Sequence, residues 1–341
     1  MTAMRSLLIL LAIFLLIGVA PFAIGSDFWL NVVIMTLYAA LLGQAWNILG
    51  GYGGQFSFGH AAFFGTGAYA VAVLQVQLGV NPWVGMALGG ALAAAVAAFI
   101  GFCTFRYGLR GSYFALVTLA FAEVLRILSN SVDFTGAGVG LLIPLARGME
   151  NFQFATRAGY FWVVWALTLA AFLTVWWIGN SRFGAQLTAV RDNEDAARAL
   201  GVDAFRVKMG AIVLSGFFSG LAGVFYAQYF LYLDPAIAYG PEISVTSLLV
   251  PIIGGMGTLF GPLLGAVGVH AISEGTRTFV GEAPGISLAL YGAVLVAMVL
   301  FMPRGLAGLL ARAPRKAHAD EAAAAPATRA EAGRAEASGH A

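Results

Sequence analysis

The sequence is poor in charged residues and contains almost no cysteine or lysine. Only 10% of the 341 residues are charged, against about 25% in soluble domains, and a single cysteine, Cys103, excludes an internal disulfide. Neither of the two lysines, Lys208 and Lys316, follows a glycine, so the chain has no Walker A phosphate loop. We therefore expect that the chain does not hydrolyse ATP by itself.

Sets of catalytic or metal-binding residues are also missing. We find no Ser/His/Asp set, no paired catalytic carboxylates and no Cys/His cluster. His60 and His270 have no partner at metal-ligand spacing, so we expect no metal and no cofactor. Basic residues are too sparse for a nucleic-acid surface. An enzyme and a nucleic-acid-binding protein are thus both disfavoured.

Apolar residues are abundant. They make up 60% of the chain and give a mean hydropathy of +0.86, which predicts an all-α polytopic membrane protein. We expect about ten transmembrane helices, within the following apolar pieces: Leu7 to Ile24, Leu30 to Leu49, Phe56 to Leu78, Pro82 to Phe105, Ser112 to Leu128, Tyr160 to Ile178, Met209 to Leu231, Ile243 to Gly255, Leu259 to Phe279 and Ile286 to Met302. The first piece is a retained span, which its length favours, or a cleaved signal peptide.

The distribution of basic residues predicts the topology. Ile243 to Gly255 is shorter than the ~20 residues of a full span, so nine crossings with a re-entrant segment are the alternative to ten. Ten crossings put most Lys and Arg residues and both termini on the cytoplasmic side of the membrane. We expect residues 1–310 to form the transmembrane domain. Residues 311–341, rich in Ala, Arg and Glu, are expected to form a disordered cytoplasmic tail.

Residues 181–208 form the one long charged segment between apolar runs, and we expect them at the cytoplasmic surface. Asp192 or Asn193 is a suitable N-cap, and Gly201 is a suitable C-terminal stop, for a helix of about eight residues. Four-residue spacing predicts ion pairs between Arg191 and Asp195 and between Glu194 and Arg198. The predicted apolar seam of this segment comprises Leu187, Val190, Ala197 and Leu200.

The order of residues in this segment carries a family resemblance. Asp195-Ala196-Ala197, followed after three residues by Gly201, resembles the Glu-Ala-Ala-x-x-x-Gly signature of ABC-importer permeases, with Asp in place of Glu. The longer string AVRDNEDAARALGVDAFRVKMGAIVLSGFFSGLAGVFYA resembles branched-chain amino acid permeases of the LivM type. The family's downstream Ile-x-Leu-Pro element is absent. The resemblance implies an ATPase-coupling loop that includes Arg191, Asp192, Asn193, Glu194, Asp195, Ala196, Ala197 and Gly201. On composition alone, a solvated loop that only fixes topology is the alternative.

A second unusual stretch runs from Gly50 to His60, with five glycines in eleven residues. Such a stretch breaks helical geometry, which a membrane tolerates only beside protein or a watery cavity. Its string NILGGYGGQFSFGHAAFFGTGAY resembles the same family's N-terminal motif. We predict a translocation pathway lined by Gln44, Asn47, Gly51, Gly53, Gln55, Ser57 and His60; a tight turn between touching helices is the alternative. A related glycine run, Gly254 to Gly261, is expected at the same membrane face.

Two Glu-x-x-Arg pairs lie near the outer ends of predicted spans. They are Glu123 with Arg126, and Glu274 with Arg277. Spacing of three places both members on one helix face, where their charges can neutralise each other. They are structural links between helices, or a gate or docking contact at the outer mouth.

The resemblance covers about residues 30 to 303. It implies an inner-membrane permease that works with a second homologous permease, two cytoplasmic ATPase subunits and a periplasmic solute-binding protein, in an ABC importer of branched-chain amino acids. Urea or short-chain amides are alternative substrates in related permeases. An ion-coupled secondary transporter is the rival class, but Glu123 and Glu274 lie away from the midplane where such a transporter needs its acids.

Overall fold

The computed structural model describes residues 3–280, 292–293, 296 and 305–310. The chain divides into two compact units, residues 1–307 and residues 308–341. Only residues 308–310 of the second unit are described, so the predicted disordered tail lies outside the described residues. The architecture below is that of the first unit.

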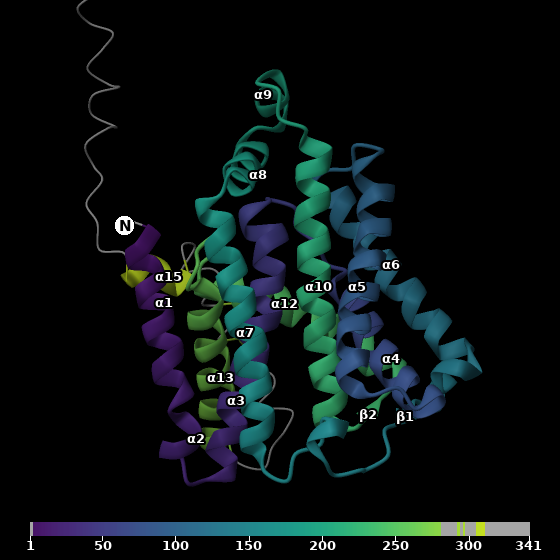
Figure 1. The fold of residues 1–341 in the computed structure, drawn as a ribbon. Helices are drawn as coiled ribbons and strands as arrows, with labels where there is room; N and C mark the ends of the chain where they lie inside the picture. Colours follow the sequence, from purple (N-terminus) through teal and green to yellow (C-terminus); the bar gives the residue numbers. More distant parts are fainter. Residues whose placement is uncertain (1–2, 281–291, 294–295, 297–304, 311–341) are drawn as a thin grey trace, which may run out of the picture. The chain divides into compact units, whose positions relative to one another are not determined.

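The first unit is built almost entirely of helices (Figure 1). The helices of the described residues are α1 (Ala3–Gly18), α2 (Ala20–Ala23), α3 (Asp27–Trp46), α4 (His60–Leu78), α5 (Pro82–Phe105), α6 (Gly111–Ser131), α7 (Arg157–Asn180), α8 (Arg182–Asp192), α9 (Glu194–Ala199), α10 (Ala204–Phe230), α11 (Pro235–Ala238), α12 (Pro241–Gly254), α13 (Gly261–Val280) and α15 (Gly305–Leu310). The all-α prediction is confirmed.

Eight stretches in the described residues are long and apolar enough to cross a membrane. They coincide with the first eight predicted pieces, and the eighth runs from Pro235 to Gly254, which joins α11 and α12. The ninth predicted piece is helix α13, which is not among the eight. Most of the tenth, Ile286 to Met302, lies outside the described residues. The protein is therefore a multi-pass membrane protein.

Helix α10 packs closely against α4 and α5. A Cβ atom added to Gly67 would lie 2.2 Å from the Gly220 carbonyl oxygen, and one added to Gly223 would lie 2.0 Å from the Phe64 oxygen. Only glycine permits so close an approach of two backbones, and small residues at helix crossings are typical of membrane bundles. Buried Phe63 and Ala222 belong to the largest apolar cluster around this crossing.

The two ends of the bundle differ. Helices α8 and α9 form one end, and a two-stranded antiparallel sheet lies at the other (Figure 1). The sheet pairs β1 (Leu141–Leu142) with β2 (Tyr232–Leu233). Single 3₁₀ turns at Asp133–Thr135, Ala137–Val139 and Met149–Asn151 occupy the loop before α7.

Several polar residues inside the spans form hydrogen bonds to other helices. Asn31 accepts a hydrogen bond from the Tyr229 hydroxyl at 2.5 Å, and the Gln228 amide donates to Gln75 at 2.6 Å. These bonds join α3 to α10 and α4 to α10. Such side chains therefore link helices, as polar groups in membrane bundles commonly do.

Candidate functional site

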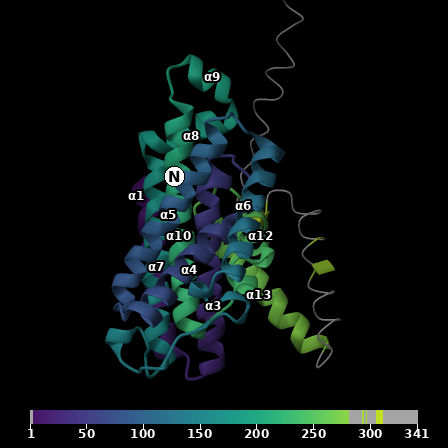
Figure 2. The same cartoon turned by 90° about the vertical axis from the view of Figure 1, so that its right-hand side faces the viewer.

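The charged segment folds as two helices that form the tip of one end of the first unit (Figures 1 and 2). Asn193 separates α8 from α9 because its backbone is extended, with φ −158° and ψ 104°. Its side-chain oxygen accepts hydrogen bonds from the Asp195 and Ala196 amides at 3.1 and 3.0 Å. Asn193 is thus the N-cap, as predicted, whereas Asp192 ends the preceding helix.

Helix α9 ends just before Gly201, as the sequence predicted. Gly201 has a positive φ of 84°, its amide donates to the Arg198 carbonyl, and the Val202 amide donates to the Ala197 carbonyl. This pattern is a Schellman-type C-terminus. The helix has six residues instead of about eight, because Asn193 and Leu200 are caps.

Two predictions about this segment are wrong. Arg191 does not pair with Asp195, because the extended Asn193 lies between them and they share no continuous helix; Arg191 pairs with Asp192 at 3.0 Å instead. Leu200 does not belong to the apolar seam, since 86% of it is exposed. The other seam members, Leu187, Val190 and Ala197, are buried as predicted.

Glu194 is the centre of an ion-pair cluster. One carboxylate oxygen accepts from Arg198 at 2.6 Å, as predicted, and the other accepts from Lys208 at 2.6 Å and from Arg110 at 3.1 Å. The Glu194 side chain is only 9% exposed and that of Lys208 only 4%. The Lys208 ammonium also lies 5.5 Å from the centre of the Phe105 ring. The cluster therefore fastens α9 to α10 and to the α5–α6 turn.

Asp195 lies beside this cluster but faces outward. Its side chain is 78% exposed, and its only ion pair in the described residues is with Arg110 at 3.3 Å. The hydrogen bond to Asp195 and the charge of Glu194 raise the pKa of Arg110, so this guanidinium stays charged. Asp195 and Leu200 together give α9 an exposed surface at the tip of the molecule. Ala196 is also exposed.

Arg191 joins the charged segment to the first glycine stretch. Its guanidinium donates to the Gly51 carbonyl oxygen at 3.1 Å. Its side chain packs on Gly54, where an added Cβ would lie 2.5 Å from the Arg191 Cγ. Gly54 also has a positive φ of 64°, which favours glycine. A displacement of α8 would thus move residues 51–54 directly, through these contacts of Arg191.

The first glycine stretch interrupts the helix, as predicted. Asn47–Tyr52 form a π-helical turn after α3, and α4 begins at His60. The Asn47 side chain accepts from the Gly257 amide at 2.8 Å and donates to the Thr258 carbonyl at 3.0 Å. Gln44 donates to the Leu259 carbonyl at 3.4 Å. The two glycine runs therefore lie side by side, at the same end of the bundle.

Ser57 and His60 are buried between α4 and α10. The His60 ring nitrogens lie 3.2 Å from the Ser57 hydroxyl and 2.8 Å from the Ser215 hydroxyl. The Trp46 indole donates to the Ser57 carbonyl at 2.8 Å. Both histidine nitrogens thus have partners within the protein. No group of three or more His, Cys, Asp or Glu side chains in the described part of the chain is placed to hold a metal ion.

The predicted pathway residues are mostly enclosed by protein. Gln44, Asn47, Gly51, Gly53, Ser57 and His60 are buried, and Gln55 is half-buried. In the described residues, a cavity of about 560 Å³ lies between α4 and α5, and one of about 340 Å³ lies between α3 and α13. None of the seven residues lines either cavity. Their part in a pathway stays a prediction.

Of the two predicted Glu-x-x-Arg pairs, only Glu123 with Arg126 is fully described by the structure. Arg126 donates to Glu123 through Nε at 2.9 Å and through Nη2 at 2.5 Å, so this pair forms as predicted. Glu274 lines the smaller cavity together with His270. The side chain of Arg277 lies outside the described residues.

Comparison with known proteins identifies the family. Residues 28–299 match the family model described as branched-chain amino acid transport system / permease component. The chain is 28% identical over 329 residues to the high-affinity branched-chain amino acid transport system permease protein LivM of Escherichia coli (strain K12), covering 89% of this chain and 76% of that protein.

Two further relatives are also named as transport permeases. A probable branched-chain amino acid transport permease protein LivM of Methanocaldococcus jannaschii is 25% identical over 268 residues, covering 73% of this chain and 77% of that protein. The autoinducer 2 import system permease protein LsrC of Klebsiella pneumoniae is 36% identical over 109 residues, 31% of each chain. No solved structure matches. The chain belongs to the permease component family of branched-chain amino acid transport systems.

Proposed function

We propose that this chain is the membrane-embedded permease subunit of an ABC importer that carries branched-chain amino acids across the inner membrane. A second homologous permease, two cytoplasmic ATPase subunits and a periplasmic solute-binding protein complete the importer, and both termini of this chain are cytoplasmic. The family match and the LivM relatives support the transport of branched-chain amino acids.

In this proposal helix α9 receives the motion of the ATPase. Its exposed surface combines an acidic side chain, Asp195, with an apolar one, Leu200. Both side chains lie at the tip of the molecule, where a partner protein can reach them. Because the chain has no Walker A loop, ATP-driven transport requires such a partner to supply the energy.

The observation that carries the proposal is the continuous set of contacts from α9 to the glycine runs. The buried Glu194–Lys208 pair holds α9 on α10, so a push on α9 moves α10 as well. Arg191 contacts the Gly51 carbonyl, and Asn47 bridges to Gly257. Motion of the α8–α9 segment therefore reaches both glycine runs through direct hydrogen bonds. We infer that these runs change shape as the pathway alternates between outward and inward access.

The test is co-purification and uptake. The chain is expressed with its ATPase and the other importer subunits and reconstituted with the solute-binding protein; we expect leucine uptake that requires ATP. Asp195→Lys combined with Gly201→Trp should release the ATPase in detergent and abolish uptake. Gln186→Lys is the matched control, because Gln186 is exposed on α8 and makes no side-chain hydrogen bond in the described residues.

Two results would contradict the proposal. One is proton-driven leucine uptake by the isolated chain without any ATPase. The other is retention of the ATPase, with full uptake, in the double variant.

A further inference from the structure

Helix α6 carries an ion pair on a face that no other described element covers. Leu116, Leu119, Glu123, Val124 and Ile127 follow one another at helical spacing and are all exposed. We refer to these five residues as the α6 outer face. The Glu123 side chain is 48% exposed, and that of its partner Arg126 is 35% exposed. Figure 1 shows α6 diverging from α5 toward the end that carries β1.

The structure places the ion pair well inside the membrane-spanning part of α6, nearer the middle of the helix than the sequence predicted. Glu123 is twelve residues from Gly111 and eight from Ser131, or roughly 18 Å and 12 Å along the axis at ~1.5 Å per residue. Intramembrane acidic and basic side chains almost always face protein or a watery cavity, because hydrocarbon solvates them poorly. A hydrocarbon environment on this face would leave the pair both exposed and poorly solvated.

Helix α1 shows what a lipid-facing helix of this protein looks like. It is also largely exposed, with Leu15 and Leu16 each 75% accessible. Yet it carries no charged residue after Arg5. The two helices therefore share exposure but differ in charge, and only α1 has the composition of a surface that meets hydrocarbon.

We infer that the α6 outer face is the surface on which a second permease chain of the same fold packs. This inference rests on the proposed function, which requires two permeases. Two chains of one fold related by an axis along the membrane normal bring residues of equal depth together. The acid of one chain can then reach the base of the other, so that a Glu–Arg pair at this depth is self-complementary.

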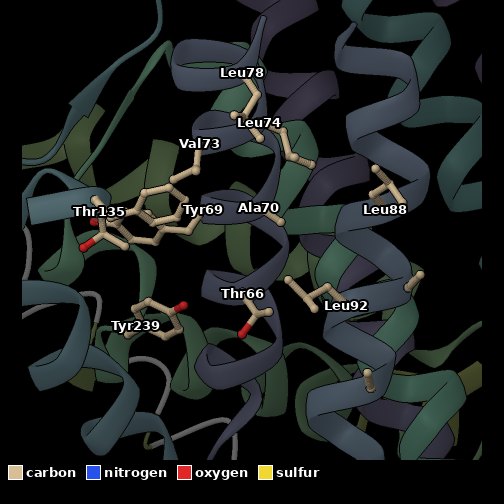
Figure 3. Close-up of a pocket in the computed structure, with 13 residues that line it drawn as sticks. Thr66, Tyr69, Ala70, Val73, Leu74, Leu78, Leu88, Leu92, Thr135 and Tyr239 are labelled. Carbon is tan, nitrogen blue, oxygen red and sulfur yellow. The ribbon is translucent and has the colours of Figure 1, made fainter. Parts of the chain in front are cut away.

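A second apolar surface lies between α4 and α5. The 560 Å³ cavity is lined by α4, α5 and the turn that follows α6, and its walls are almost entirely apolar. Figure 3 shows Thr66, Ala70 and Leu74 along one helix, facing Leu88 and Leu92 on the next. Leu88 and Leu92 are both about half exposed, so bulky apolar side chains can enter from outside. The cavity thus adds a second apolar surface beside the turn that follows α6.

Lipid-phase quenching of a fluorophore tests this directly. Cys103→Ala removes the only cysteine, and Val124→Cys then places a bimane label on the α6 outer face; Leu16→Cys on α1 is the control. Each labelled chain is reconstituted into nanodiscs containing brominated lipid, alone and as the complete importer. We expect the Leu16 position to be quenched equally in both. We expect quenching at Val124 to fall at least threefold in the complete importer.

The occupant is identified by a benzophenone maleimide attached at Val124→Cys in the complete importer, followed by mass spectrometry of the cross-linked peptides. A membrane-spanning peptide of a permease chain supports the inference, whether it comes from a second copy or from a homologous subunit. Equal quenching at Val124 and Leu16 in an importer that still transports overturns this inference alone, as do cross-links to lipid. An isolated chain that takes up leucine without ATP overturns the proposed function, and this inference with it.

Discussion

Replacing Glu194 by Gln removes the charge at the centre of the cluster that holds α9. The variant keeps the size of the side chain but leaves the Lys208 ammonium, 4% exposed, without its counter-charge at 2.6 Å. Removing one partner of a buried ion pair costs ~3–5 kcal/mol. The amide oxygen of Gln and the Phe105 ring offset part of that loss, so we expect about 3 kcal/mol.

This free energy should appear as local opening of α9. At ~1.4 kcal/mol per factor of ten, a loss of about 3 kcal/mol raises the opening equilibrium by roughly two orders of magnitude. Hydrogen exchange of peptides that cover residues 195–203 measures it, because the amides of Ala197, Leu200 and Val202 are bonded within this turn. We expect these amides to exchange ~100-fold faster in Glu194→Gln.

Two further variants show whether the effect comes from the unpaired Lys208 ammonium. Adding Lys208→Met to Glu194→Gln removes the unpaired ammonium and should restore most of the protection. Arg206→Gln breaks an exposed pair with Asp203, in which the arginine is 85% exposed, and should change the free energy by less than ~1 kcal/mol. Wild-type exchange in Glu194→Gln, or no recovery in the double variant, would refute the reasoning.

Three other predictions follow from the contacts around the glycine runs. Arg191→Ala removes the hydrogen bond to the Gly51 carbonyl. We expect ATP hydrolysis within about twofold of wild type but at least tenfold less leucine transported per ATP hydrolysed. A proportional loss of hydrolysis and transport would contradict the transmission of motion through Arg191. Gly51→Ala places a Cβ 2.0 Å from the Asn47 Oδ1, whereas the Cβ of the control Gly25→Ala meets nothing within 4 Å. Thermal unfolding in detergent should show that only Gly51→Ala lowers the free energy of unfolding, by ~1–3 kcal/mol. Asn47→Leu leaves the Gly257 amide unpaired and should lower the free energy of unfolding by ~1–3 kcal/mol in the same assay. An unchanged midpoint of thermal unfolding would argue against the hydrogen bond between Asn47 and Gly257.

The sequence predicted most of the local structure of the site. The N-cap at Asn193, the stop at Gly201 and the Glu194–Arg198 pair depend on residues within one or two turns of each other, and local spacing suffices to predict such features. Spans were predictable for a similar reason, since each one is a run of mostly apolar residues. The interruption between α3 and α4 followed from the density of glycine.

Contacts between distant segments were not predictable in this way. Arg110 and Lys208 complete the Glu194 cluster from positions 84 residues before and 14 residues after it, and the sequence indicated them only as positive charges at the membrane surface. The rarity of lysine was the one available signal for Lys208. The expected Arg191–Asp195 pair was wrong because spacing rules assume a continuous helix, which the extended Asn193 interrupts.

Labelling of a single cysteine at the tip of α9 tests the central claim most directly. Leu200→Cys in the Cys103→Ala background exposes one thiol, at a position that is 86% accessible. A membrane-impermeant maleimide should label it in inside-out vesicles but not in right-side-out vesicles, and bound ATPase should protect it at least tenfold. Labelling from the outside, or equal labelling with and without the ATPase, would contradict the account.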